Sequence, residues 1–260
     1  MQVPFKIICV FSDLKNQIRG NTSAVVELQA PVSSEVMQDL ANDINQPATT
    51  FIWKDDQSHW HVRWYATDGE IMLCGHGSLA AVAYLNQQTV EFRYRNGIIK
   101  GCKQAEARFT LILDPIYSKK AEYDPSIATG LGVGIQDYYT NDNKHLVIVK
   151  DEATVKTMKP NFELLRKLKP FGYIVTAPGD KVDFVSRTIV PKVRQLEDPA
   201  TGSSHAALVP YWSEKLDKPE LTALQLSKRG GRFICKYQNE AVELTGETFD
   251  LASGFLMVSN

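Results

Sequence analysis

Apolar residues occur along the whole chain in short runs that are separated by turn-forming residues. Runs of four to eight residues rich in Val, Ile, Phe and Thr are typical of β-strands. In the first half they predict strands at 3–10, 24–28, 49–54, 59–66, 71–73, 90–95 and 109–113. Arg19-Gly20-Asn21 and Asp68-Gly69 supply turns between these runs. The first half is therefore expected to be mostly β-sheet.

Two segments of the first half follow a helical pattern instead. Ser33 or Ser34 can cap a helix that runs to about Asn45, because apolar residues recur there three and four positions apart. The second segment starts with Cys74-Gly75-His76-Gly77 and continues as small and apolar residues over 78–85. It predicts a glycine turn that opens a buried helix.

A polar, proline-containing stretch at 117–125 links this half to a second one with the same kinds of element. Asp217 is expected to cap a helix that has Pro219 in its first turn and ends at Gly230-Gly231. The other elements predicted are strands at 136–140, 146–150, 173–176 and 184–190, a helix capped near Asn161, and a β-meander over 232–258 with turns at Asn239-Glu240 and Gly246-Glu247. We expect two lobes, residues 1–118 and 119–260, and the last strand can also pack back on the N-terminal lobe.

A weak internal repeat relates the two halves. At an offset of 127 residues, the segments around two glycine turns align, with Gly75 on Gly202, Ala80 on Ala207 and Tyr84 on Tyr211. The match is short, but in each segment a strand leads into a small-residue turn that opens an apolar helix. The pattern favours an α+β fold of two similar halves that face each other across a cleft.

Composition and charge exclude several classes of protein. The 260 residues are 43 % hydrophobic and 23 % charged, which is ordinary for a folded globular chain. The net charge of −1 provides no positive field for a polyanion, so no nucleic acid partner is expected. No apolar run is long enough to span a membrane, and no membrane partner is expected. Scattered cysteines without a Cys-x-x-Cys pair favour reduced thiols and a cytoplasmic location; they are Cys9, Cys74, Cys102 and Cys235.

Reactive side chains and glycines occur together at only two places, the turns at 74–78 and 198–205. Both turns are expected to open helices, whose first N–H groups are unpaired and favour an anion. Two such turns that converge on one cleft would bind a carboxylate and stabilise the enolate that forms when a proton is removed beside a carbonyl. This is the chemistry of isomerases and epimerases, and it requires neither a metal nor a cofactor.

Each residue in these turns also has a purely structural interpretation. His76 can cap its helix or bond a neighbouring carbonyl. The Asp-Pro pair at Asp198 commonly starts a helix, and Ser203 and Ser204 are ordinary residues of a first helical turn. His205 is expected to pack or to form a hydrogen bond at the helix start.

Two other kinds of site are not favoured. His59 and His61 share one face of a predicted strand, but they lack a third ligand nearby, so no metal site is expected. A racemase with paired thiols needs a cysteine at both glycine turns. The repeat pairs Cys74 with Thr201, which disfavours two-thiol racemisation.

Several motifs together resemble the PhzF-like phenazine-biosynthesis family. They are Cys74-Gly75-His76-Gly77-Ser78-Leu79-Ala80-Ala81, Glu197-Asp198-Pro199-Ala200-Thr201-Gly202-Ser203, Pro210-Tyr211-Trp212 and Gln225-Leu226-Ser227-Lys228-Arg229-Gly230-Gly231, with shorter similarity at Gly20-Asn21, Ala24-Val25-Val26 and Arg63-Trp64-Tyr65. The resemblance implies the diaminopimelate-epimerase fold, in which each half is a barrel-like sheet around a central helix and the active site lies between the halves. It also implies a cofactor-free isomerase and a homodimer.

The resemblance assigns roles to individual residues. His76, Asp198 and Ser203 match the polar active-site positions of the family, and Asn21 matches a residue near the substrate. The remaining expected substrate-binding residues are Cys74, Gly75, Gly77, Thr201, Gly202 and Ser204. The family's acid/base glutamate falls at Ala48, and a methyl group cannot accept a proton.

Three functional hypotheses follow for a small, anionic, amino acid-like ligand. In the first, an isomerase of altered chemistry uses Asp198 or His76 as its base. In the second, Cys74 acts as a lone thiol base on a different substrate. In the third, the chain has no catalytic activity and is a homodimer that binds a small anion.

Overall fold

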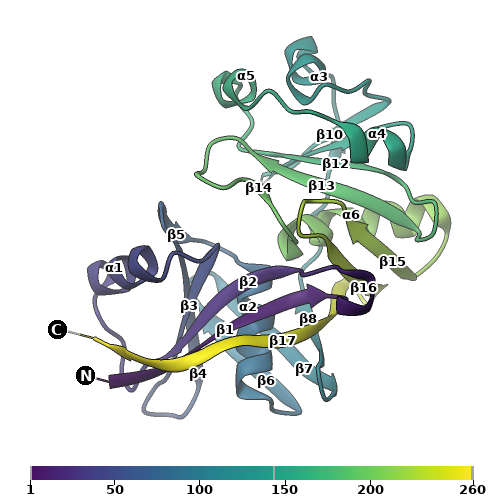
Figure 1. Cartoon of the computed structure of the whole chain (residues 1–260). Coiled ribbons are helices and arrows are strands. Elements are labelled where there is room, and N and C mark those ends of the chain that lie inside the picture. Colours follow the sequence, from purple (N-terminus) through teal and green to yellow (C-terminus); the bar gives the residue numbers. More distant parts are fainter. Residues whose placement is uncertain (1, 143, 259–260) are drawn as a thin grey trace. The chain divides into compact units, whose positions relative to one another are not determined.

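The computed structural model describes residues 2–142 and 144–258, and the chain divides into two units (Figure 1). Unit 1 contains the residues up to Leu113 and those from Glu243 onward, whereas unit 2 is Asp114–Val242. Each unit has its own cluster of buried apolar residues. Within the described ranges, no helix combines the length and apolar character needed to cross a membrane.

Unit 1 is a closed ring of strands around one helix (Figure 1). Strand β1 pairs with both β2 and β17, and successive pairs through β3, β4, β6, β7 and β8 lead back to β17. The ring consists of β1 (Gln2–Ser12), β2 (Asn21–Glu27), β3 (Ala48–Lys54), β4 (Trp60–Ala66), β6 (Thr89–Tyr94), β7 (Gly97–Ala105), β8 (Arg108–Leu113) and β17 (Ala241–Met257). Helix α2 (Gly75–Leu85) packs against β1, β2, β3, β7 and β8, and so fills the ring. Its residues 75–82 are all buried, as expected for a helix that is apolar on every side.

The other elements of unit 1 are 3-10 helix η1 (Leu14–Asn16), helix α1 (Ser34–Ile44) and strand β5 (Gly69–Ile71). Helix α1 packs on β3 and β4. It begins after Ser33, whose hydroxyl accepts the Val36 N–H at 3.3 Å, and it ends at Asn45 in the left-handed conformation, so both predicted ends are confirmed. Gly20 has a φ of +66°, and a Cβ there would lie 2.0 Å from the Val10 carbonyl oxygen, which explains why the turn before β2 needs glycine.

Unit 2 contains a second mixed sheet with four helices. Strands β10, β11, β12 and β13 pair in sequence, and β13 also pairs with β14 and β15. The strands are β9 (Lys119–Lys120), β10 (Asp137–Thr140), β11 (His145–Ile148), β12 (Tyr173–Pro178), β13 (Phe184–Val190), β14 (Leu196–Asp198), β15 (Glu220–Gln225) and β16 (Gly231–Gln238). The helices are α3 (Pro125–Leu131), α4 (Glu152–Thr157), α5 (Phe162–Lys167) and α6 (Gly202–Leu216). Helix α6 packs on β15 and β16, and α4 packs on β12 and β13.

The helix predicted to start at Asp217 is wrong. Asp217 ends α6 with a φ of 50°, and the following residues form strand β15. Along β15 every second side chain is buried, and the strand pairs in parallel with β13 and antiparallel with β16. The period of two that marks a strand was therefore present, but the Asp and Pro residues at its start favoured a helix cap.

Other elements differ from the sequence prediction in smaller ways. The turn predicted at Gly246-Glu247 is wrong, because these residues lie inside β17, near a register shift in its pairing with β1. The turn at Asn239-Glu240 is confirmed, since both residues have positive φ between β16 and β17. Strand β5 begins at Gly69 instead of 71, and the sequence pattern missed β7, α3 and α4.

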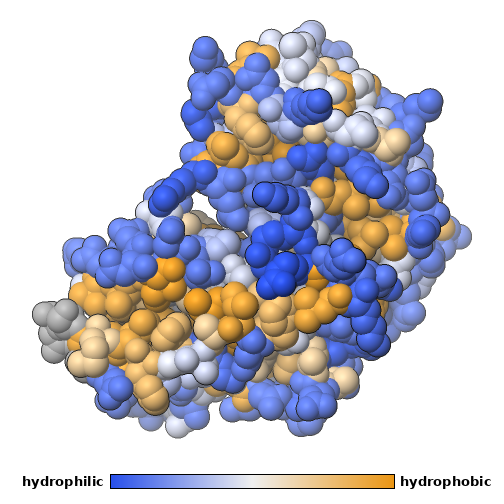
Figure 2. Space-filling view, in the orientation of Figure 1, coloured by the Kyte–Doolittle hydropathy of each residue, from blue (hydrophilic) through white to orange (hydrophobic). Residues whose placement is uncertain are grey.

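Apolar side chains are exposed on the C-terminal half of β17. Leu251, Phe255 and Met257 are 49 %, 65 % and 76 % exposed. Figure 2 shows apolar surface on unit 1 along the course of this strand. Large exposed apolar residues that cluster on one strand mark a surface suited to association.

Candidate functional site

In unit 1 the candidate residues lie at the start of helix α2. Cys74 is the residue that caps the helix, and its Sγ accepts the Gly77 N–H at 3.4 Å. The same sulfur lies 3.5 Å from Nδ1 of His76, and both side chains are buried. The cap is thus a cysteine sulfur and not His76. The Cys74 sulfur thus contacts both the first turn of the helix and the imidazole ring.

Gly77 allows this helix start to press against the barrel wall. A Cβ at Gly77 would lie 2.6 Å from Oγ1 of Thr50 and 2.8 Å from Cδ1 of Trp64. Any side chain would therefore push the first turn of α2 away from strands β3 and β4. The glycine is required by packing, and the turn is held against side chains of the sheet.

Ala48 stands on the same side of β3 as this contact. It precedes Thr50 by two residues, and in a strand such residues share a face. Ala48 is fully buried, and its carbonyl oxygen accepts the Ser23 hydroxyl at 3.0 Å. Ser23 also bonds Thr50 at 2.8 Å, and Asn21, on the same strand as Ser23, is fully buried. Ala48 therefore places a methyl group next to a buried polar patch that contains Asn21, Ser23 and Thr50.

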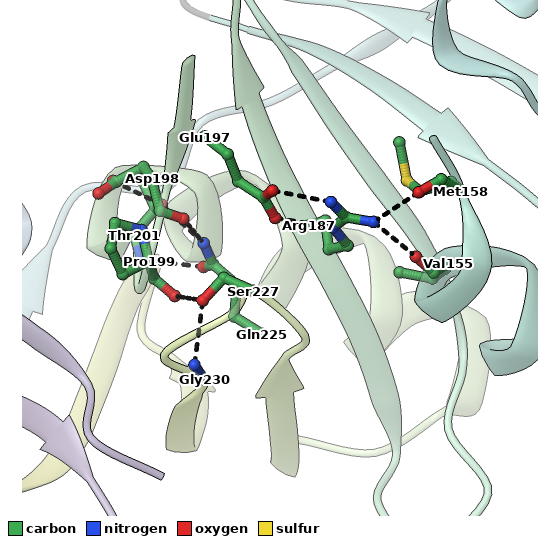
Figure 3. Close-up of polar contacts among 10 residues, drawn as sticks. All are labelled: Val155, Met158, Arg187, Glu197, Asp198, Pro199, Thr201, Gln225, Ser227 and Gly230. Carbon is green, nitrogen blue, oxygen red and sulfur yellow. Dashed lines mark hydrogen bonds and ion pairs between the residues drawn. The ribbon is translucent and has the colours of Figure 1, made fainter. Parts of the chain in front are cut away.

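In unit 2 the candidate residues lie where β14 ends and α6 begins (Figure 3). Thr201 precedes the helix, and its hydroxyl reaches Oδ2 of Asp198 at 2.6 Å. The Gln225 side chain, from β15, bonds three atoms of this turn: the Thr201 N–H at 2.9 Å, the Asp198 carbonyl oxygen at 2.5 Å and the Thr201 hydroxyl at 3.0 Å. Gln225 is 1 % exposed, so these bonds are shielded from water.

The direction of each hydrogen bond in this network is determined. A backbone N–H only donates, so the Gln225 atom that faces the Thr201 N–H is the amide oxygen. The amide nitrogen then donates to the Asp198 carbonyl and to the Thr201 hydroxyl. The Thr201 hydrogen is left for Oδ2 of Asp198, whose carboxylate therefore accepts it. The arrangement fixes the orientation of the Asp198 side chain.

A partly buried ion pair fixes the strand that carries Asp198. The Arg187 guanidinium binds the Glu197 carboxylate through two contacts of 2.7 Å, and it also donates to the carbonyls of Val155 and Met158 at 3.4 and 3.0 Å (Figure 3). Two-pronged pairs of this kind restrict geometry more than single contacts do. Ser227 adds a bond to the Pro199 carbonyl at 2.7 Å. The residues on either side of Asp198, Glu197 and Pro199, are thus both fixed by hydrogen bonds.

The first turn of α6 carries three further polar residues in different environments. Ser204 is fully buried and accepts the Thr188 hydroxyl at 3.0 Å. Ser203 accepts from the Lys144 ammonium at 3.2 Å, and both residues are more than nine-tenths buried. His205 is fully buried, its Nδ1 lies 2.8 Å from the Thr201 carbonyl oxygen, and its ring stacks on Phe233. Burial lowers the pKa of His205 to about 4.

The structure brings together, within each unit, several of the residues that the sequence singled out. In unit 1, Cys74 and His76 are in contact, and in unit 2 Asp198, Thr201 and Ser203 lie within the turn that opens α6. The expectation that His205 packs and bonds at the helix start is confirmed. The helix starts at Gly75 and Gly202 confirm that both predicted glycine turns open helices.

Sequence reasoning missed three residues of the site region. Gln225 begins one of the family motifs, but the sequence assigned it no role. In the structure it is buried on β15 and bonds the turn that contains Asp198 and Thr201. Arg187 lies on β13 and Lys144 directly precedes β11, and neither is part of a motif. Only the fold brings Arg187 to Glu197 and Lys144 to Ser203, so no sequence signal could have found them.

The chain matches known proteins over nearly its whole length. The family model of phenazine biosynthesis-like proteins, PhzC-PhzF, matches residues 10–254. The chain belongs to this family. An uncharacterized isomerase from Pseudomonas aeruginosa is 34 % identical over 265 residues, and the match covers 100 % of both chains. The crystal structure of a PhzF-family phenazine biosynthesis protein from Enterococcus faecalis superposes with a TM-score of 0.90 at 35 % identity and covers 99 % of this chain and 100 % of that chain.

A more distant structure shows how far the fold extends. The hydroxyproline epimerase from Agrobacterium vitis superposes with a TM-score of 0.65 over 98 % of this chain and 92 % of that chain, at 10 % identity. At that identity only the fold is shared. The sequence resemblance to the PhzF-like family and the expected α+β, epimerase-like fold are thus both confirmed.

Proposed function

We propose that this PhzF-family protein is a cofactor-independent isomerase that moves a proton next to the carbonyl or carboxylate group of a small, anionic, amino acid-like metabolite. The observation that carries the proposal is the fixed hydrogen-bond direction at Asp198. Its Oδ2 accepts from Thr201, whose own hydroxyl accepts from Gln225, so a chain of hydrogen bonds orients the carboxyl group of Asp198. A general base has to be held within reach of the proton that it removes.

The proposed reaction has two proton transfers. Asp198 removes a proton from the carbon beside the carbonyl, and the electron pair moves into an enolate. The unpaired N–H groups at the start of α6, with the Ser203 hydroxyl, stabilise the negative charge on oxygen. Asp198 then returns the proton to the carbon skeleton of the substrate. The backbone and side chains of unit 2 supply the groups that these steps use.

The side chain at residue 48 favours a second candidate function. Ala48 is fully buried where family members carry the acid/base glutamate, and no carboxyl group replaces it on that face of β3. If the remaining groups are insufficient, the chain is a small-anion-binding homodimer without catalytic activity. In that case the network around Asp198 serves binding alone.

Proton exchange in deuterated water separates the two functions. The protein is incubated with amino acids and 2-oxo acids, and deuterium incorporation beside the carboxylate is followed by NMR. The proposed isomerase exchanges the proton of at least one acid, and Asp198→Asn abolishes the exchange. Asp180→Asn is the matched control, because Asp180 is an exposed carboxylate of unit 2.

If exchange is lost only in Cys74→Ser, the Cys74 thiol is the base and the proposal for Asp198 is wrong. If no acid exchanges while at least one of them raises the melting temperature, the chain is the anion-binding protein instead.

A further inference from the structure

A buried lysine lies against the first turn of α6. Lys144 directly precedes strand β11, and only 7 % of the residue is exposed. Its N–H donates to Oδ1 of Asn141 at 3.0 Å, which fixes its backbone. Lysine is rarely this buried unless its ammonium has a specific partner.

Glycine makes room for the lysine stem. A Cβ at Gly172 would lie 3.3 Å from Cγ of Lys144 and 2.8 Å from the Ile189 carbonyl oxygen. The hydrocarbon part of Lys144 therefore packs against the backbone of Gly172, and its ammonium lies 3.2 Å from Oγ of Ser203. The side chain is held extended toward the helix start.

This contact leaves the Ser203 hydroxyl as a donor. An ammonium has three hydrogens and no acceptor, so Ser203 is the acceptor of the bond. Within residues 2–142 and 144–258, the hydrogen of the Ser203 hydroxyl has no acceptor, although the residue is only 8 % exposed. A buried hydroxyl donor without an acceptor is suited to a bound anion.

We propose that Lys144 is a substrate-binding residue whose ammonium, together with the Ser203 hydroxyl, binds the carboxylate of the substrate. The inference rests on the proposed function and narrows it to carboxylic acids that react at the carbon beside the carboxylate. Removing that proton from a carboxylate creates two negative charges on one group. An ammonium against the carboxylate neutralises one of them and lowers the barrier to proton removal.

Benzoate and benzamide form a matched pair of probes, since they differ in charge and not in shape. Their binding to the full chain is measured by NMR titration at constant ionic strength. We expect benzoate to bind in preference to benzamide, to shift the amide signals of residues 202–204, and to bind at least about 10-fold more weakly to Lys144→Met, the loss expected for one charged hydrogen bond.

Three variants separate structure from charge. Lys144→Met removes the charge and keeps an unbranched side chain of similar length. Lys144→Arg keeps the charge and is expected to retain most of the binding, whereas Lys150→Met removes one exposed positive charge just beyond β11. If Lys144→Met does not fold, Ser203→Ala removes the second donor and is expected to weaken benzoate binding as well.

The result that overturns the proposal is equal binding of benzoate to wild type, Lys144→Met and Ser203→Ala, or equal binding of benzoate and benzamide. The proposed function is judged separately by proton exchange. If exchange occurs with an unchanged KM in Lys144→Met, the inference about Lys144 is wrong while the isomerase assignment stands. If Lys144→Met loses benzoate binding and wild type exchanges no acid, the anion site stands without catalysis.

Discussion

The fully buried His205 makes the stability of unit 2 depend on pH. Its Nδ1 donates to the Thr201 carbonyl oxygen at 2.8 Å, and its Nε2 has no hydrogen-bond partner within the described part of the chain. The ring lies between Phe233, on which it stacks, and Phe184. A second proton would have to be placed on Nε2 among these rings, and for this reason burial lowers the pKa of His205 from 6.5 to about 4.

The sign and the size of the effect follow from the two pKa values. The unfolded chain takes up a proton near pH 6.5, whereas the folded chain takes it up near pH 4, so the stabilising contribution is complete above 6.5 and is lost as the pH falls from 6.5 to 4. Between pH 7 and pH 5 the loss from this residue is about 2 kcal/mol, and below pH 4 it approaches about 3 kcal/mol.

Urea unfolding at pH 7 and pH 5, followed by tryptophan fluorescence, measures this loss. His205→Phe keeps a flat ring between Phe184 and Phe233 and removes the titrating group. We expect the wild type to lose about 2 kcal/mol more than His205→Phe between the two pH values. His145 also has a pKa lowered by burial, but it is present in both proteins and cancels from the comparison. Equal losses in the two proteins would refute the assignment of the acid sensitivity to His205.

Four further predictions concern the site region and the surface. Thr201→Val removes the hydroxyl that donates to Asp198 and is expected to lower kcat for proton exchange about 10-fold or more, whereas Thr201→Ser retains it; a loss that is the same in both would contradict the role of the hydroxyl. Ala48→Glu is expected to increase the exchange rate of a substrate at a stability cost of about 1–3 kcal/mol for the buried carboxyl, and unfolding of this variant would show that the space near β3 is filled. Gly77→Ala is expected to destabilise the protein by about 1–3 kcal/mol in urea unfolding, because its Cβ would lie 2.6 Å from a side-chain oxygen, and an unchanged midpoint would contradict that packing. Phe255→Asp is expected to convert a homodimer to a monomer in light scattering; a wild type that is already monomeric would remove the proposed dimer.

The sequence predicted the parts of the fold that are determined locally. Helix α1 has its cap at Ser33 and its end at Asn45, and both signals are properties of single residues. The helices that open at Gly75 and Gly202 were predicted because small residues and apolar runs stand side by side in the chain. Local chemistry was enough for these elements.

Elements and contacts that depend on distant parts of the chain were harder to predict. Strand β15 is a strand because β13 and β16 flank it, and its first residues alone favour a helix. The same holds for the site region, where Asp198, Thr201 and Ser203 were singled out. Gln225 reaches Asp198 and Thr201, and Lys144 reaches Ser203, only because the sheet brings distant segments together. Burial of these partners is a property of the folded unit and not of any short segment.

The hydrogen-bonded position of Asp198 bears on which reaction class the proposed isomerase can catalyse. Epimerisation needs one group to remove a proton and another to deliver one on the opposite face of the same carbon, whereas the shift of a double bond can use a single group that removes and returns the proton on one face. Asp198 has an arrangement that suits a single group, since the hydrogen bonds through Thr201 and Gln225 keep its side chain in one orientation. If Asp198 acts alone, part of the hydrogen removed from the substrate returns to the product in deuterated water. If a different group supplies the second proton, the product contains deuterium from solvent alone. The isotope content of the product therefore distinguishes a one-group shift from a two-group mechanism.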